Sequence, residues 1–270
     1  MPALELRRLW YLDGRKMAAS SQPSRRRLRR ETEAISQSLA PHIPRSCTHV
    51  RGHRGVKGAL RQIQRRMPKA RFVARFDIAA YYTSMRHDVI EAQVAATDLD
   101  VDRRELIADY LVLPDSQGAG VGMVASGGLS PLLGALYLVS LDRRMDRLCR
   151  RKQLVHYVRY MDDIVLLART RWELRRAIAA LYEEIATLGL RLHRVKRFIG
   201  RTTQGFDFLG YRIRARARLR PSVEGLRRLR GRARRLYERE GDWQRPGRAD
   251  EPGPGLLVRM SSIGGAENAA

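Results

Sequence analysis

Three aspartates lie within or between apolar segments of the sequence, where burial of a charged carboxylate costs free energy. Asp77 falls inside the apolar run 72–78, and Asp162 and Asp163 are adjacent between two apolar segments. Like charges a few Å apart repel each other, and surroundings of low dielectric constant enlarge that cost. A turn readily takes one aspartate, so the adjacent pair needs a further explanation. A bound divalent cation provides one.

Mg²⁺ suits such a site because it prefers carboxylate oxygens and keeps water or substrate phosphates as its other ligands. Two ions about 4 Å apart activate an attacking 3′-hydroxyl and stabilise the leaving pyrophosphate in phosphoryl transfer. The alternative is that arginines, for example Arg75 or Arg159, balance the aspartates in ordinary salt bridges. Residue types alone leave both interpretations open.

The elements that must position the aspartates follow from hydrophobic periodicity and turn residues. A strand is predicted at 72–79 and a strand–turn–strand hairpin at 155–168, with Asp162 and Asp163 in its turn. Helices are predicted over 84–113 (with a loop near 98–102), from Ser130 as N-cap onwards, and over 171–188, and further strands at 190–193 and 206–213. This order predicts an α+β fold in which helices cover one face of an antiparallel sheet.

The net charge of +25, from 53 basic and 28 acidic residues, indicates a polyanionic partner, and nucleic acid is the first candidate. Only five of the basic residues are lysines. Arginine suits phosphate because its planar fork donates two hydrogen bonds at once. Residues 1–48 are basic and irregular in pattern, which predicts either a solvated arm or an extension that contacts RNA or DNA.

No segment is predicted to cross a membrane, because the longest apolar stretch, 129–141, is short and interrupted by proline and glycine. The first ten residues lack the apolar core of a secretory signal. Cys47 and Cys149 show no metal-ligand spacing, which predicts two free thiols in a reducing compartment. We therefore expect a cytoplasmic protein.

The motif at 160–163, Tyr-Met-Asp-Asp between apolar strands, resembles the YxDD box of reverse transcriptases. Four further segments resemble motifs of that family and occur in the family's order, at 75–85, 129–142, 188–201 and 205–213. The resemblance covers roughly residues 49–240 and is closest to bacterial enzymes related to group II introns and other retroelements. It implies a right-hand polymerase with fingers, palm and a short or partial helical thumb.

The resemblance also implies roles for the acidic residues. Asp77 and Asp162 would hold two Mg²⁺ ions, for which Mn²⁺ can substitute, and Asp163 would assist. The main-chain carbonyl of Ile78 would be a further ligand. Together these residues would form the catalytic metal site.

Other positions receive roles in substrate binding from the same resemblance. Tyr82 would be the steric gate beneath the incoming sugar, although a core tyrosine is the alternative. Lys196 would lie near the leaving pyrophosphate, although a solvated lysine is the alternative, and Ser130 would lie at the nucleotide. Phe208, Leu209, Gly210 and Tyr211 would grip the primer, and Arg51, Arg54 and Lys57 would contact template or triphosphate.

Three departures from the family pattern affect these expectations. The family shows Pro-Gln-Gly-x-x-x-Ser-Pro before the long helix, whereas the stretch 124–131 keeps only the Ser-Pro. The segment 193–197 lacks the usual Pro, Asp and Thr, and the region after 215 is short for a full thumb. These changes affect the expected contacts with nucleotide, template and primer, whereas the three aspartates of the expected metal site are all present.

The leading functional hypothesis is an RNA-directed DNA polymerase that extends a DNA or RNA primer with dNTPs on an RNA template. The alternatives are a maturase-like RNA-binding protein and a template-independent, defence-associated polymerase with the same fold. A dedicated structured RNA or an accessory protein is a further expected partner. The expected divisions are a basic extension (1–48), fingers and palm (49–215), a partial thumb (216–245) and an irregular tail (246–270).

Overall fold

The computed structural model describes residues 4, 6–12, 15–113, 118–125, 127–215 and 217–242. Its main helices are α1 (Gln22–Leu39), α2 (Gly55–Arg66), α3 (His87–Ala95), α4 (Val101–Val112), α5 (Ser130–Tyr137), α6 (Val139–Arg150), α7 (Arg171–Thr187) and α8 (Val223–Asp242). Its strands are β1 (Leu6–Leu12), β2 (Arg15–Ser20), β3 (Phe72–Ala79), β4 (His156–Tyr160), β5 (Asp163–Ala168), β6 (Arg191–Leu192), β7 (Phe198–Arg201), β8 (Phe206–Phe208), β9 (Tyr211–Ile213) and β10 (Arg220–Pro221).

The central sheet has the order β4-β5-β3-β6, and β7 also pairs with β3. All of its pairs are antiparallel. The strand predicted at 72–79 and the hairpin predicted at 155–168 are confirmed as β3 and β4–β5. The α+β fold with an antiparallel sheet packed on helices is therefore confirmed.

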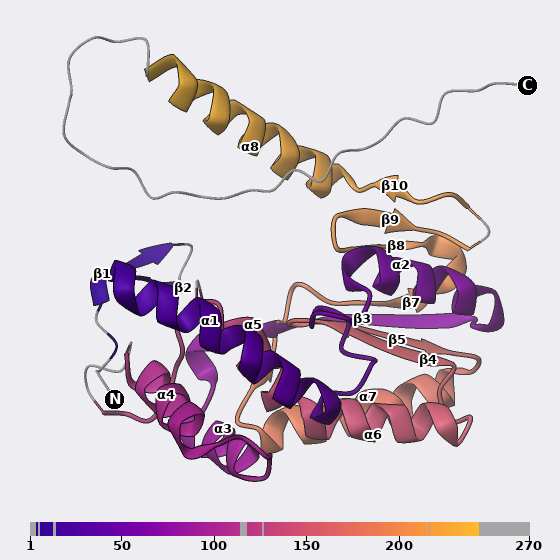
Figure 1. Ribbon diagram of the computed structural model, residues 1–270. Helices are drawn as coiled ribbons and strands as arrows, with labels where there is room; N and C mark the ends of the chain where they lie inside the picture. Colours follow the sequence, from indigo (N-terminus) through magenta and orange to yellow (C-terminus); the bar gives the residue numbers. More distant parts are fainter. Residues whose placement is uncertain are drawn as a thin grey trace, which may run out of the picture. The chain divides into compact units, whose positions relative to one another are not determined.

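Both faces of this sheet are covered, whereas the sequence predicted helices on one face. Alternate residues of β5 enter two separate cores: Ile164 and Leu166 join the core that contains α7, and Val165 and Leu167 join the core that contains α2. Figure 1 shows α6 and α7 along one face, with α2 and β8–β9 along the other. A strand buried on both faces is apolar at every position, which explains why its sequence lacks alternation.

The predicted helix that begins near Ser130 is two helices, α5 and α6, which meet at Leu138. Leu129 occupies the N-cap position of α5, so the predicted N-cap at Ser130 is off by one residue. The predicted apolar face is nevertheless buried, with Leu136 and Met145 both inside the main core. The two helices predicted over 84–113 are confirmed as α3 and α4.

The N-terminal region is not an irregular arm along its whole length. Residues 22–39 form α1, whose start is capped by the Ser21 side chain at 3.4 Å from the Ser24 amide. Its buried residues Leu28, Ile35 and Leu39 belong to the main core. These positions recur along one side of the helix, as expected where an amphipathic helix packs against a core.

The chain divides into two units, 1–226 and 227–270. Most of α8 lies in the second unit, where its leucines at 229 and 236 are exposed. The helix α8 lies within the segment 216–245 that was expected to form a partial helical thumb, whereas the predicted tail at 246–270 lies outside the described residues. No helix in the described part of the chain is long and apolar enough to span a membrane. Cys47 and Cys149 are free, as predicted.

Candidate active site

The tip of the β4–β5 hairpin is a two-residue loop formed by Met161 and Asp162, because Tyr160 pairs directly with Asp163. Met161 has a φ of +55°, and Asp162 is not among the residues with positive φ. A positive φ at the first loop residue alone is the pattern of a type II′ turn, which matches the twist of the flanking strands. Glycine would adopt that φ more easily, so the surrounding structure must hold Met161 there.

Two side chains beneath the turn bind the main chain of Met161. Its amide donates to His49 Nδ1 at 2.9 Å, and its carbonyl accepts from the Arg159 guanidinium at 2.9 Å. His49 reaches this position because residues 46–48 run beside β4. There the Arg159 amide donates to the Ser46 carbonyl at 2.9 Å, and the Thr48 amide donates to the Arg159 carbonyl at 2.8 Å. The side chains of His49 and Arg159 thus fix the conformation of the turn.

Arg159 is fully buried and paired with the equally buried Asp142 of α6, at 2.6 Å. The same guanidinium donates to the Ala135 carbonyl, and the Tyr157 hydroxyl donates to Asp142 at 2.5 Å. A buried ion pair is tolerable only when such extra hydrogen bonds satisfy its remaining donors and acceptors. Arg159 therefore balances Asp142, not the aspartates of the turn.

His49 is held as a neutral imidazole. Its Nε2 lies 2.9 Å from the Pro131 carbonyl, which can only accept, so this nitrogen carries the proton and Nδ1 accepts from Met161. Burial, followed by the nearby charge of Arg159, lowers the pKa of His49 to about 4. His49 thus connects the first turn of α5 to the β4–β5 turn.

A pocket of about 310 Å³ lies at the C-terminal end of β3, beside this turn. Asp77 and Asp162 both line it, and the Ile78 amide donates to the Asp162 carbonyl at 3.1 Å. Asp163 lies directly opposite Asp77 in the β3–β5 ladder, but it does not belong to the pocket lining. Two of the three predicted carboxylates therefore face one cavity.

An irregularity in the sheet brings two further side chains to Asp77. Ile78 pairs with Leu192 and Arg75 pairs with Phe198, so five residues (193–197) stand opposite the two residues 76 and 77. The three extra residues form a loop beside Asp77, whose carbonyl accepts from the His193 amide at 2.7 Å. His193 and Lys196 of this loop line the pocket.

Lys196 and Tyr82 both line the pocket that contains Asp77 and Asp162. The Lys196 ammonium is 3.9 Å from Asp77 Oδ1, and its side chain is 59% exposed, so it can move away when a cation binds. Tyr82 lines the same pocket from the short turn Tyr82–Ser84 and contacts the ring of Tyr81 at 5.1 Å. The Tyr81 hydroxyl donates to the Gly134 carbonyl of α5 at 2.5 Å, which anchors this turn.

The donor set fits a divalent cation in part. Two carboxylates and the main chain at Ile78 supply the hard oxygen ligands that Mg²⁺ or Mn²⁺ prefers. Within the described residues, however, no group of three or more His, Cys, Asp or Glu side chains is arranged to hold a metal. The pocket therefore offers a two-carboxylate site, with Asp163 outside its lining.

Other predicted residues lie away from the pocket. Ser130 is fully buried, and its hydroxyl contacts the Tyr110 hydroxyl at 2.6 Å and donates to the Val124 carbonyl. Its side chain thus supports the loop before α5 instead of facing the pocket. Arg51 is exposed and paired with Glu33, and Arg54 and Lys57 are exposed at the start of α2. None of these residues lines the pocket.

The predicted primer-grip residues span the β8–β9 turn. Phe208 is fully buried in the α2-side core, whereas Tyr211 is 37% exposed. Leu209 and Gly210 make the turn with φ of +49° and +81°. Only the turn and Tyr211 are therefore presented to solvent, while Phe208 anchors the hairpin.

The sequence profile described as "Reverse transcriptase (RNA-dependent DNA polymerase)" matches residues 21–213. The chain belongs to the reverse transcriptase family. The match supports a nucleotidyltransferase polymerase of the reverse transcriptase type, and reverse transcriptase domains generally use divalent metals. The match begins at the start of α1, so the family resemblance extends further toward the N-terminus than residue 49, where the sequence motifs begin.

Solved structures of yeast telomerases share the fold of this reverse transcriptase chain. Telomerase from Candida albicans, in complex with a fragment of telomeric RNA, matches with a TM-score of 0.53 and 12% identity over 74% of this chain. Apo telomerase from Candida tropicalis matches with a TM-score of 0.59 and 10% identity over 82%. The match covers only 38% and 49% of those chains. No curated protein sequence matches.

Sequence reasoning missed the residues that support the turn. The sequence predicts Arg159 only as a partner for the aspartates, and it assigns His49 no role. A signal was present, because Arg159 lies within an apolar strand and Asp142 directly follows an apolar helical stretch. Two opposite charges in buried segments require each other. His193 had no such signal, since its place depends on the three-residue shift in the ladder.

Proposed function

We propose that this reverse transcriptase is an RNA-directed DNA polymerase that extends a primer 3′-hydroxyl with dNTPs on an RNA template. The observation that carries the proposal is the pocket in which Asp77 and Asp162 meet Tyr82 and Lys196. In phosphoryl transfer, catalysis is mostly positioning and neutralisation of charge. A pocket that combines two carboxylates with an exposed lysine and a tyrosine supports that chemistry.

Asp77 and Asp162 would hold two Mg²⁺ ions, with the Ile78 carbonyl as a further ligand and Asp163 as an assisting carboxylate. When bound, these ions activate the attacking hydroxyl and neutralise the charge of the leaving pyrophosphate. Mn²⁺ would substitute, because it takes the same oxygen ligands.

The remaining residues would bind and orient the nucleotide, the primer and the template. Tyr82 would lie beneath the incoming sugar and exclude a 2′-hydroxyl. Lys196 would leave Asp77 and bind the departing phosphates, a movement that its exposure of 59% permits. The turn at Leu209–Gly210 and Tyr211 would contact the primer strand, and Arg51, Arg54 and Lys57 would contact the template or the triphosphate. The helix α8 would serve as a partial thumb.

The position aligned with the family's glutamine is Ala125, which has no amide to offer to a nucleotide or template. Its neighbour Val124 is buried, and Ser126 lies outside the described residues. This observation favours the second candidate, an RNA-binding, maturase-like protein of the group II intron type with little polymerisation. A template-independent polymerase would use the same carboxylates.

A primer-extension assay with RNA, DNA or no template, dNTPs and Mg²⁺ tests the proposal. The unaltered chain should extend the primer only on RNA. Asp77→Asn and Asp162→Asn should each lower the rate at least about 10³-fold while RNA binding is retained, because a lost metal ligand removes charge neutralisation in the transition state. Asp98→Asn, an exposed carboxylate elsewhere, is the matched control. Equal rates in all three variants would overturn the carboxylate assignment, and extension without template would favour the third candidate.

A further inference from the structure

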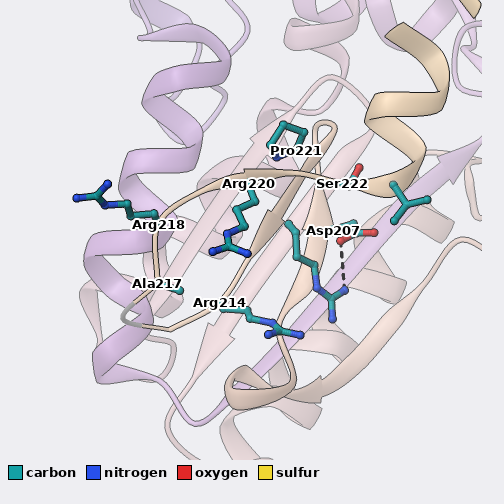
Figure 2. Close-up of a pocket in the computed structure, with 9 residues that line it drawn as sticks. Asp207, Arg214, Ala217, Arg218, Arg220, Pro221 and Ser222 are labelled. Atoms are coloured by element: carbon teal, nitrogen blue, oxygen red, sulfur yellow. Dashed lines mark hydrogen bonds and ion pairs between the residues drawn. The ribbon is translucent and has the colours of Figure 1, made fainter. Parts of the chain in front are cut away.

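A second hollow, of about 690 Å³, lies on the small sheet formed by β8, β9 and β10, in the unit 1–226. It shares no lining residue with the carboxylate pocket. Its lining contains four arginines, at 212, 214, 218 and 220, and one carboxylate, Asp207. Figure 2 shows Arg214 and Arg220 within the hollow and Arg218 at its edge. The proposed polymerase activity assigns it no role.

The register of the small sheet creates this concentration of charge. Asp207 pairs with Arg212, and Arg212 pairs with Arg220, so the three side chains stand in a row on one face. The opposite face carries Phe206 and Ile213, which are buried in the core beside α2. The apolar residues thus fix the hairpin and hold the arginines on the outer side.

Among the described residues that line the hollow, the single carboxylate, Asp207, is already paired. Arg212 forms an ion pair with Asp207 at 3.2 Å and also donates to the Gln204 carbonyl at 2.9 Å. In the part of the chain that the structure describes, Arg214, Arg218 and Arg220 have no carboxylate within ion-pair distance. Three uncompensated guanidinium groups around one concave surface repel each other, and a bound anion relieves that repulsion.

We propose that this hollow, defined here as the arginine pocket, binds phosphate groups. The planar guanidinium fork matches two phosphate oxygens at once, and three such forks suit a ligand with several phosphates. None of the described residues that line it has an aromatic side chain on which a base could stack, so the pocket takes phosphates without regard to sequence. The backbone of a nucleic-acid strand and a free polyphosphate share this chemistry.

The test compares two variants of the full chain that each lose three charges. In the first, Arg214, Arg218 and Arg220 are changed to glutamine. In the matched control, the exposed arginines 147, 150 and 176, on the helices that cover the other face of the central sheet, are changed to glutamine. Binding of a short labelled single-stranded RNA is measured across a salt series without dNTPs or divalent cations. Because this binding assay needs no polymerase activity, it tests the arginine pocket even if the proposed polymerase activity is absent.

The arginine-pocket variant should lower the slope of log K against log salt by about 2, because each lost phosphate contact removes roughly 0.7 for a single strand. The control should keep the slope of the unaltered chain. Equal slopes in the two variants would overturn the proposal. Competition with inorganic pyrophosphate separates the two sources: displacement of the RNA identifies a polyphosphate site, and its absence identifies a backbone site. If the triple variant does not fold, Arg218→Gln alone, which alters only an exposed side chain, should lower the slope by about 0.7.

Discussion

At the scale of single residues, the conformation of the site depends on a buried ion pair that does not line the pocket. Arg159 and Asp142 are both fully buried, and together they hold the carbonyl of Met161 in a turn with positive φ. Removing one partner would leave the other charge buried without compensation, which is far costlier than losing an exposed pair. The conformation of the turn therefore depends on an ion pair that the carboxylate motif does not reveal.

The first prediction concerns that pair. Arg159→Met should lower the free energy of unfolding by about 3–5 kcal/mol, and adding Asp142→Leu should restore much of the loss. Arg144→Met is the matched control, because it removes a partly exposed pair with Glu183 and Glu184 that contributes about 1 kcal/mol or less. Urea denaturation measures all of these differences. A double variant no more stable than Arg159→Met would contradict the prediction.

The second prediction concerns pH. Burial, followed by the charge of Arg66, lowers the pKa of His156 from 6.5 to about 4, and its Nε2 has no hydrogen-bond partner. Between these pKa values the unfolded chain binds more protons than the folded chain, so stability is lost as the pH falls from about 6.5 to 4. The pKa of His49 is lowered likewise.

Each histidine should cost up to about 3 kcal/mol when the pH reaches 4. His156→Leu removes one titrating group without removing a hydrogen bond, and it should flatten the curve of stability against pH by that amount. The measurement is urea unfolding from pH 7 to pH 4. His193→Leu is the control, because the loop around His193 is largely exposed. A curve with unchanged slope in His156→Leu would contradict the assignment.

At the scale of elements, the three extra residues opposite β3 decide which side chains reach Asp77. The third prediction follows from this. Replacing 193–197 by two residues, Thr-Val, should let β6 and β7 pair with β3 without interruption, so that the fold and its melting temperature are kept. His193 and Lys196 would then be absent from the pocket, and primer extension should fall by at least about 10²-fold. Lys196→Met alone should reproduce most of the loss, and an active replacement variant would refute this role for the loop.

The elements also show what a sequence can and cannot predict. β3 and the β4–β5 hairpin were predicted correctly, because long apolar runs around a turn are a strong local signal. The break at Leu138 was missed, since apolar residues continue through it and only packing against the sheet decides the bend. The burial of Ser130 and the reach of the 193–197 loop depend on pairings between distant segments. The strands that carry the carboxylates were thus predictable, whereas the position of Ser130 and the reach of the 193–197 loop were not.

At the scale of the whole molecule, the N-terminal segment belongs to the fold. The helix α1 contributes Leu28, Ile35 and Leu39 to the core that also contains Phe76 and Ile164 of the central sheet. Burying three such side chains contributes on the order of 5–9 kcal/mol, which is comparable to the net stability of a typical domain. The core of the fold therefore includes α1, although the basic composition of this helix resembles that of a nucleic-acid-binding arm.

The fourth prediction tests this inclusion with single changes in the full chain. Ile35→Asp places an unpaired carboxylate in the core and should prevent cooperative folding, because the cost of burial exceeds the margin of stability. Arg29→Asp, on the exposed side of α1, introduces the same residue and should unfold at nearly the same temperature as the unaltered chain. Thermal unfolding followed by circular dichroism separates the two. If Ile35→Asp melts like Arg29→Asp, then α1 is not part of the core and the basic segment is an appended arm, as its composition first suggested.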